Sequence, residues 1–275
     1  MQVVVGSGKG GTGKTLLSTA LAQCWGDRVQ YLDCDVEEPN GHIFLRPELS
    51  SRKECTVTVP EIVRDKCSLC GKCRDICQFN SIAIFGETIM TFGDMCHSCN
   101  GCFLVCEEEA ILETTRLIGE VETGHSGDVE FVHGRLRVGE AMSVPLIKAV
   151  KQHAGGDGLT IVDAPPGTSC PFVESVTDGD YILLVTESTP FGLHDLQLAV
   201  EVVRSVDKPF GVVINRAGLG DVSVKKWCEN EGIPVVLQIP FERSIAEGYA
   251  QGMSLLESKP SLRSRLRELL EEISR

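Results

Sequence analysis

Short apolar runs alternate along the chain with segments whose apolar residues recur at helical spacing. Residues 15–25 and 193–206 show this helical spacing, and shorter helices are expected near residues 145–153 and 222–231. Buried strands that alternate with such helices form parallel sheets covered on both faces. The pattern therefore predicts an α/β fold with a doubly wound, mostly parallel sheet. The apolar runs that predict its strands are residues 2–5, 29–35, 159–163, 181–187, 210–216 and 233–240.

One segment, residues 60–113, breaks this alternation with two clusters of cysteines. Two strands are expected after it, near residues 116–122 and 129–138. We therefore predict two structural units, an inserted domain at residues 60–113 and a discontinuous domain made of residues 1–59 and 114–275.

The chain ends in an amphipathic segment, residues 261–275, which we interpret as a helix packed on the domain. A helix lying on a membrane surface is the alternative, but such helices carry bulky aromatic residues and a strongly basic polar face. This segment has neither. The apolar residues that share one face are Leu262, Leu266, Leu269, Leu270 and Ile273.

Composition and charge argue against two classes of partner. The 275-residue chain has a formal net charge of −13 and an aromatic content of 5%, whereas nucleic-acid binding needs clustered lysine and arginine and is helped by aromatic stacking. No apolar run reaches the roughly 18 to 20 residues that span a bilayer, and the N-terminus lacks a signal-peptide pattern. We therefore expect a cytoplasmic protein without nucleic-acid or membrane partners.

A glycine-rich loop follows the first apolar run. Residues 8–15 read GKGGTGKT and match the pattern G-x-x-x-x-G-K-[ST] between a strand and a helix, which is the setting of a P-loop. Glycines let successive backbone N–H groups converge on phosphates, and the helix N-terminus adds positive potential. Lys14 is expected to reach the β- and γ-phosphates, and the Thr15 hydroxyl to ligate Mg²⁺. The sequence thus predicts that the chain binds ATP and Mg²⁺.

The loop also carries an earlier lysine, Lys9. Residues 9–15 resemble the deviant Walker A motif of the MinD/ParA/Mrp superfamily, P-loop ATPases with a CbiA-type nucleotide-binding domain. In that family the early lysine reaches across a dimer interface to the partner's nucleotide, where a second cation stabilises transition-state charge. The resemblance implies that Lys9 and Lys14 are catalytic and that a homodimer forms on ATP binding. A solvated loop lysine is the alternative for Lys9. The implied nucleotide-binding residues of the loop are Gly8, Lys9, Gly10, Gly11, Thr12, Gly13, Lys14 and Thr15.

Other parts of the superfamily pattern follow in the same order along the chain. The resemblance implies that Asp33 approaches Mg²⁺ through water and that Asp35 orients the attacking water. It also implies that Asp163, at the end of a Walker B strand, holds the Mg²⁺ shell together with the loop threonine. Asn215 would recognise adenine, and the loop that closes over adenine would lie near Pro240. An aspartate at a strand end can also be a helix cap or a turn residue.

Two cysteine runs in the insert share the spacing C-x₂-C-x₂-C-x₃-C. This spacing is typical of bacterial ferredoxins with two 4Fe–4S clusters, in which the fourth cysteine of each run ligates the other cluster. Gln78 and Glu107 replace the prolines that usually follow the runs, which leaves the ligands unchanged. Zinc, which also binds paired cysteines, is the alternative metal. The resemblance to a ferredoxin implies one cluster on Cys67, Cys70, Cys73 and Cys106, and a second on Cys96, Cys99, Cys102 and Cys77.

A further cysteine, Cys170, follows Asp163 at a spacing that resembles one ligand of the subunit-bridging cluster in the nitrogenase iron protein. That protein needs a second cysteine per subunit, and the sequence has none between residues 107 and 169. We therefore favour a structural thiol at this position. Cys24 and Cys228 are likewise expected to serve packing, because free cysteine is a small and frequently buried residue.

Both resemblances together imply an ATP-binding and ATP-hydrolysing dimeric switch that carries two 4Fe–4S clusters. Such a protein would couple its nucleotide state to electron transfer, or to the metallocluster maturation of a redox or metalloprotein partner. Its hydrolysis is expected to be slow and stimulated by that partner. A MinD/ParA-like positioning or scaffold ATPase with structural clusters is the first alternative. An ATP-dependent amidotransferase-like synthase is the second, although the remaining length leaves no room for the glutaminase domain that such enzymes usually use.

Overall fold

In the computed structural model, which describes residues 1–26, 28–156 and 158–274, a nine-stranded sheet organises the larger part of the chain. Its strand order is β11-β10-β9-β1-β8-β2-β7-β6-β3. The strands from β11 to β7 are parallel, whereas β6 and β3 are antiparallel at one edge. The predicted α/β fold with a mostly parallel sheet is thus confirmed. The strands are β1 (Gln2–Gly6), β2 (Val29–Asp33), β3 (Glu48–Ile62), β6 (Ile111–Ser126), β7 (Val129–Leu136), β8 (Leu159–Asp163), β9 (Tyr181–Glu187), β10 (Phe210–Ala217) and β11 (Val235–Pro240).

Helices cover both faces of this sheet, because its central strands are apolar on both sides. In β1, for example, Val4 belongs to one hydrophobic core while Val3 and Val5 belong to the other. Helices α5 to α8 pack in the first core, and α1, α2, α10 and α11 pack in the second. The helices of this part are α1 (Lys14–Trp25), α2 (Gly41–Leu45), α5 (Val144–Lys151), α6 (Cys170–Val176), α7 (Pro190–Ser205), α8 (Ser223–Asn230), α9 (Arg243–Ala250), α10 (Leu255–Ser258) and α11 (Leu262–Ile273).

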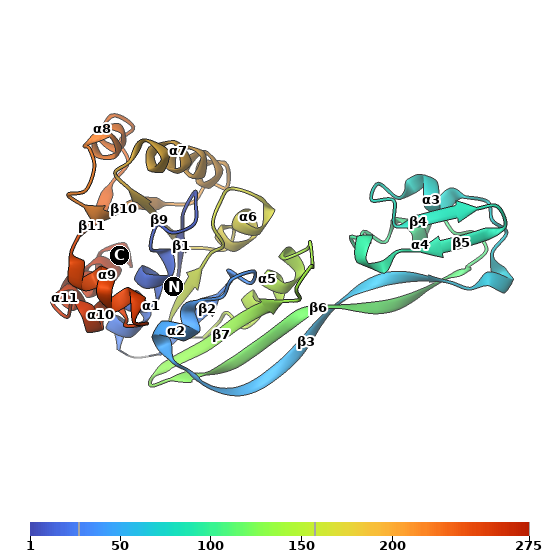
Figure 1. The fold of residues 1–275 in the computed structure, drawn as a ribbon, viewed down its shortest axis with the longest axis horizontal. Helices are drawn as coiled ribbons and strands as arrows, with labels where there is room; N and C mark the ends of the chain where they lie inside the picture. Colours follow the sequence, from blue (N-terminus) through green and yellow to red (C-terminus); the bar gives the residue numbers. More distant parts are fainter. Residues whose placement is uncertain (27, 157, 275) are drawn as a thin grey trace.

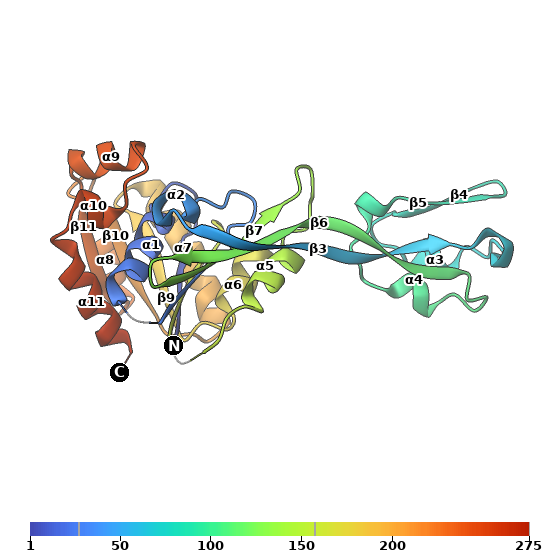
Figure 2. The same cartoon turned by 90° about the horizontal axis from the view of Figure 1, so that it is seen from below.

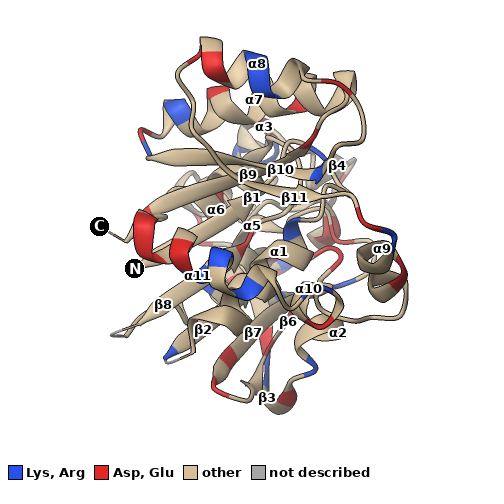
Figure 3. Cartoon of the chain, turned by 90° about the vertical axis from the view of Figure 1, so that its left-hand side faces the viewer, with Lys and Arg blue, Asp and Glu red and all other residues tan. Residues whose placement is uncertain are grey.

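The C-terminal helix α11 packs on α1, as predicted. Its four leucines are buried, and Arg263 donates a hydrogen bond to the backbone oxygen of Gln23 at the end of α1. Arginine and glutamate pair along its outer side, so the helix does not present a face of one charge (Figure 3). Within the described residues, no helix is both long enough and apolar enough to cross a membrane.

Strands β3 and β6 extend beyond the sheet as a twisted ribbon that carries a small module away from the larger part (Figures 1 and 2). They pair from Glu48 opposite His125 to Ile62 opposite Ile111, and the register shifts between Cys55 and Thr56. The sequence predicted only a shorter strand near residues 116–122. The first seven residues of β3 are all exposed and polar for the most part, so the local pattern has no apolar alternation. Pairing of the backbone with β6 makes this segment a strand.

The module at the end of the ribbon is built from two similar halves. Each cysteine run begins with a 3₁₀ turn and continues into a short α-helix. Leu69 and Ser98 occupy equivalent places in the two runs, as do Gly71 and Asn100, and all four have positive φ. Its buried apolar core is very small. Its elements are a 3₁₀ turn (Arg64–Lys66), α3 (Lys72–Ile76), β4 (Ile82–Phe85), β5 (Thr88–Thr91), a 3₁₀ turn (Gly93–Met95) and α4 (Gly101–Leu104).

Candidate functional site

The glycine loop connects β1 to α1 at the carboxyl end of the parallel strands. Gly13, directly before the helix, has a φ of 95°, a left-handed conformation that favours glycine. Asn215 at the end of β10 donates a hydrogen bond of 2.7 Å from Nδ2 to the backbone oxygen of Thr12. A Cβ atom at Gly13 would lie 2.3 Å from this Nδ2. The loop is therefore anchored from a neighbouring strand, and its backbone N–H groups are left free of side-chain obstruction at the turn.

A cavity of about 420 Å³ opens over the loop. It combines residues from the loop, from the segment after β2, and from the ends of β10 and β11. Among the residues expected to bind nucleotide or catalyse, those that line it are Gly10, Gly11, Gly13, Lys14, Thr15, Asp35, Asn215 and Pro240. Asp33 and Asp163 are fully buried. Gly8, Lys9 and Thr12 belong to the loop but do not line the cavity, and the backbone oxygen of Lys9 accepts a hydrogen bond from Ser7.

Two carboxylates lie side by side in the sheet, because β2 and β8 pair with Asp33 opposite Asp163. Asp33 accepts hydrogen bonds from the backbone N–H groups of Asp35 and Gly41. One oxygen of Asp163 accepts a hydrogen bond of 3.1 Å from the Tyr31 hydroxyl. The other, Oδ1, is buried and has no hydrogen-bond partner among the described residues.

Burial raises the pKa of both Asp33 and Asp163. The charge of Asp163 raises the pKa of Asp33 further, and Lys14 opposes the rise for Asp163. A divalent cation would supply the missing partner of the Asp163 carboxylate and would favour the ionised forms. The donor set therefore fits Mg²⁺, with Asp163 and the Thr15 hydroxyl as the expected ligands and Asp33 acting through water.

Lys14 pairs with Asp35 at 3.7 Å, and the two side chains are 7% and 14% exposed. Burial raises the pKa of Asp35 to about 6, and the neighbouring Lys14 partly opposes this rise. A polyphosphate in the loop would be a stronger partner for the Lys14 ammonium than a single carboxylate is. Binding of a nucleotide would thus release Asp35 from Lys14, and Asp35, two residues beyond the end of β2, lines the cavity.

The far wall of the cavity is apolar and was only partly predicted. Phe241, Ile245 and Tyr249 line it beside Pro240, and the last two lie one turn apart on α9. Sequence reasoning pointed to the loop near Pro240 but not to these side chains. The spacing of Ile245 and Tyr249 was a readable signal, since residues four apart share a helix face. This wall suits the flat face of a base.

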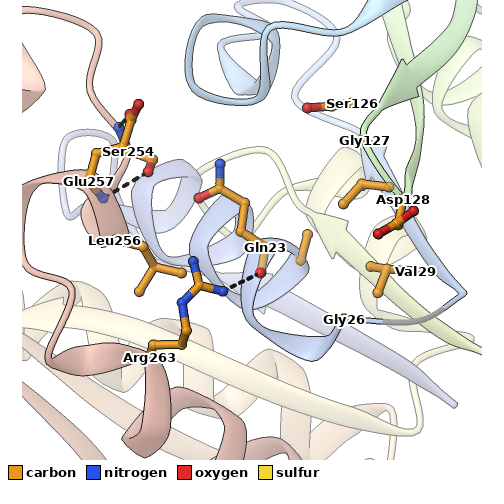
Figure 4. Close-up of a pocket in the computed structure, with 12 residues that line it drawn as sticks. Gln23, Gly26, Val29, Ser126, Gly127, Asp128, Ser254, Leu256, Glu257 and Arg263 are labelled. Atoms are coloured by element: carbon orange, nitrogen blue, oxygen red, sulfur yellow. Dashed lines mark hydrogen bonds between the residues drawn. The ribbon is translucent and has the colours of Figure 1, made fainter.

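A second hollow, of about 390 Å³, lies at the other end of α1 (Figure 4). Several of its polar groups form hydrogen bonds within the fold, whereas the side-chain oxygen of Gln23 is buried without a partner among the described residues. Arg263 donates to the backbone oxygen of Gln23, and Ser254 and Glu257 form a capping box at the start of α10. None of the residues expected to bind ligands lines this hollow, so the candidate nucleotide site is the cavity over the glycine loop.

The module brings its eight cysteines into two groups of four, and each group lines one small pocket. Cys67, Cys70, Cys73 and Cys106 line the first pocket, and Cys77, Cys96, Cys99 and Cys102 line the second. Each group therefore takes three cysteines from one run and the fourth from the other. Backbone N–H groups point at three of the sulfur atoms, with N–S distances of 3.3 Å (Ala110 to Cys106), 3.4 Å (Ser81 to Cys77) and 3.5 Å (Ser98 to Cys96).

Across the part of the chain that the structure describes, no group of three or more histidine, cysteine, aspartate and glutamate side chains could hold a metal ion. Burial raises the pKa of Cys102 to about 11, so this thiol stays protonated at neutral pH unless a metal displaces the proton. Thiol donors and backbone N–H groups directed at sulfur are groups that could hold an iron–sulfur cluster.

Five further residues belong neither to the two groups of four cysteines nor to the cavity over the glycine loop. His97 stacks on Phe79 at a ring distance of 3.7 Å and lines the second pocket without adding to its four thiols. Cys170 is exposed at the first position of α6. Cys24 and Cys228 are buried, as expected for packing residues. Glu107, which stands where ferredoxins usually have proline, pairs with Lys72.

A phosphate-binding loop at the carboxyl edge of a parallel sheet, beside two buried aspartates, defines a P-loop nucleotide-binding protein. More specifically, the chain belongs to the CobQ/CobB/MinD/ParA nucleotide binding domain family, whose pattern matches residues 3–256. Members of this family are ATPases, and Mg²⁺ and nucleotide are the ligands expected for a MinD-like member. The superfamily that the glycine loop indicated is therefore confirmed.

One relative, an uncharacterized protein of Methanocaldococcus jannaschii, is 31% identical over 99% of this chain and 96% of its own length. Among solved structures, the septum site-determining protein MinD of Pyrococcus horikoshii, complexed with Mg-ADP, has a TM-score of 0.60 at 18% identity, covering 100% of this chain and 96% of that one. The cell division ATPase MinD of Pyrococcus furiosus has a TM-score of 0.58 at 18% identity, covering 99% and 98%. At this identity the two structures show a shared fold.

We predict that Asn215→Ala lowers the affinity for nucleotide about tenfold or more, because it removes the buried hydrogen bond that holds the loop backbone at Thr12. The loss is expected both for ATP and for tripolyphosphate, which lacks a base, when each is measured by calorimetric titration. Asn215→Asp is the matched variant, because it keeps the size of the side chain but loses the amide donor. Unchanged tripolyphosphate affinity in both variants would show that Asn215 acts on the base alone.

Proposed function

We propose that this protein is an ATP-hydrolysing dimeric switch whose small module carries two 4Fe–4S clusters and exchanges electrons with, or helps to mature, a metalloprotein partner. The single observation that carries this proposal is the arrangement of the cysteines. Eight of them form two groups of four around separate pockets, on a ribbon that grows out of the sheet of a P-loop protein.

The nucleotide half of the proposal rests on the cavity over the glycine loop. Lys14 and Thr15 stand where they would bind the β- and γ-phosphates and Mg²⁺. Asp163 has a buried oxygen that lacks a partner among the described residues. Asp35 would orient the attacking water once nucleotide draws Lys14 away. Asn215 and Pro240 line the same cavity, and we assign them to the base.

The cluster half rests on the chemistry of the module. Clusters of this kind are held by four thiolates and supply one-electron transfer when bound. Backbone N–H groups directed at sulfur are one of the features that tune their potential. The buried core of the module is made mainly of Ile82, Ile89 and two of the cysteines. A core of that size seldom stabilises a fold, so metal ligation would supply the missing stability.

Dimerisation follows from the family resemblance of Lys9. This residue belongs to the glycine loop but does not line the cavity, which is what a lysine acting on a partner's nucleotide requires. In the proposed dimer its ammonium would add a second cation at the γ-phosphate, where negative charge is spread in the transition state.

A second candidate function is that of a MinD/ParA-like positioning or scaffold ATPase, in which the clusters are structural. The family and fold comparisons favour this candidate, because two of the similar structures are named for septum-site determination and cell division. They offer no counterpart for the electron-transfer role. The two candidates differ in whether the clusters are redox-active and respond to nucleotide.

Anaerobically purified protein should contain about eight iron and eight sulfide per chain, because two groups of four thiols are available. Cys70→Ser and Cys99→Ser, one from each pocket, should each lower the iron content, while the exposed Cys170→Ser should leave it unchanged. Elemental analysis beside visible absorbance measures this. Stoichiometric zinc without iron–sulfur absorbance would overturn the cluster assignment.

Lys9→Ala should abolish ATP-dependent dimerisation, because the cation that acts across the interface is lost. Asp35→Ala should retain ATP and accumulate as dimer, because only the positioning of water is lost. Sedimentation with ATP, beside phosphate release, separates the two effects. Lys225→Ala, which removes an exposed lysine from α8, is the control. Dimerisation and hydrolysis like wild type in both variants would contradict the assigned roles.

A redox titration of the clusters with ADP and with a non-hydrolysable ATP analogue separates the two candidate functions. If the protein is a nucleotide-dependent switch, the reduction potential of the clusters should differ by about 40 mV or more between the two nucleotides. This difference corresponds to about 1 kcal/mol for one electron, the lower end of typical allosteric coupling. Lys14→Ala, which cannot hold the phosphates, should show no difference. Equal potentials in both nucleotide states of the wild type would favour the scaffold ATPase.

A further inference from the structure

The module touches the larger part of the chain at a second place besides the ribbon. Residues 137–143 form the loop between β7 and α5, and this loop reaches the second cysteine run. Arg137 donates a hydrogen bond of 2.8 Å to the Asp94 carboxylate, and Asp94 lies two residues before Cys96. Figure 2 shows this loop standing out from the larger part on the side of the module.

A buried ion pair joins the same loop to the same cysteine. Arg116 of β6 pairs with Glu140 of the loop, and the two side chains are 9% and 1% exposed. Through its Nη2 atom Arg116 also reaches the backbone oxygen of Cys96, at 3.4 Å. Glu140 is held in turn by the backbone N–H of Met142, at 3.1 Å. A buried, hydrogen-bonded pair of this kind has little freedom to move independently of its surroundings.

The start of the loop is bonded to the segment that follows Asp35. The N–H of Leu136 donates a hydrogen bond of 2.9 Å to the backbone oxygen of Val36, and Val36 directly follows Asp35. The next N–H, that of Arg137, donates to the backbone oxygen of Ile118 on β6, at 2.8 Å. A continuous series of bonds therefore runs from Asp35 through the start of the loop to Asp94 and Cys96.

The loop is tied to the second aspartate strand as well. It leads into α5, whose Lys151 pairs with Asp178 at 2.9 Å and also with Glu174. Both partners belong to α6 or to the turn after it, and α6 follows the loop that leaves β8 at Asp163. The segment after Asp33 thus bonds to the residue that precedes the loop, and the segment after Asp163 pairs with the far end of the helix that follows the loop.

We infer that these four side chains, Arg116, Glu140, Arg137 and Asp94, form a clasp that transmits the nucleotide state to the second cysteine site. A nucleotide that takes Lys14 from Asp35 shifts the segment after β2, and the bond from Val36 to Leu136 passes that shift to the clasp and on to the Cys96 backbone. The inference rests on the proposed nucleotide function but needs no particular partner.

Hydrogen exchange of the full chain, measured by mass spectrometry with ADP and with a non-hydrolysable ATP analogue, tests the clasp. Exchange of the amides at residues 94–100 should differ about fivefold or more between the two nucleotides in the wild type. Arg137→Gln should reduce this difference to less than twofold. The matched control is Arg135→Gln, since Arg135 is also exposed and ion-paired, but with Glu122 on the sheet.

The charge-swapped double variant Asp94→Arg/Arg137→Asp restores the pair in the opposite sense and should recover most of the difference. Arg116 and Glu140 are left in place, because loss of this buried pair risks misfolding; Arg137 also lies 3.8 Å from the Glu140 carboxylate, so part of the difference stays lost. Protection of residues 8–16 by nucleotide, with no difference at residues 94–100 in the wild type, would overturn the clasp and leave the nucleotide function intact. Absence of protection at residues 8–16 would overturn both.

Discussion

The burial of two carboxylates beside each other is the constraint on which the nucleotide site depends. Parallel pairing of β2 and β8 puts Asp33 opposite Asp163, and neither side chain is exposed to water. Two negative charges in such a place need compensation. Backbone N–H groups compensate Asp33, whereas Asp163 keeps one oxygen that is buried and unpartnered among the described residues. A Mg²⁺ ion bound together with a nucleotide would supply that compensation.

Lys14 connects these carboxylates to the ligand. Lys14 is buried and pairs with Asp35. Its positive charge therefore compensates a carboxylate of the site even without a bound phosphate. If a nucleotide binds with Mg²⁺, its phosphates would pair with Lys14 and the Mg²⁺ would pair with the carboxylates. No buried charge would then be left without a partner. The same exchange would free the segment after β2, so that binding and a conformational response would follow from one electrostatic balance.

The two antiparallel strands at the edge of the sheet, β3 and β6, connect the cysteine module to the larger part of the chain. A parallel strand needs a crossover connection, whereas antiparallel strands can be joined directly and can run on past the sheet. Beyond the register shift after Cys55, β3 and β6 continue from Thr56 and Leu117 to Ile62 and Ile111. The cysteine module is therefore continuous with the sheet that contains Asp33. This continuity keeps the cysteine module and the nucleotide-binding part in one backbone framework.

The sequence by itself determined the features whose physical cause is local. The loop at Gly8–Thr15 could be predicted because phosphate binding needs particular residues at fixed spacing, and the parallel strands could be predicted because burial on both faces makes them continuously apolar.

Tertiary structure alone decided the features that depend on contacts between residues far apart in the chain. The exposed start of β3 becomes a strand through β6, and Leu136 meets Val36 through the neighbouring β2 and β7. The ion pair of Arg116 with Glu140 likewise has no local signal. Contacts between residues far apart in the chain leave no periodic pattern in either segment. The order of apolar and polar residues in a segment reflects only which of its own positions face the core or the solvent.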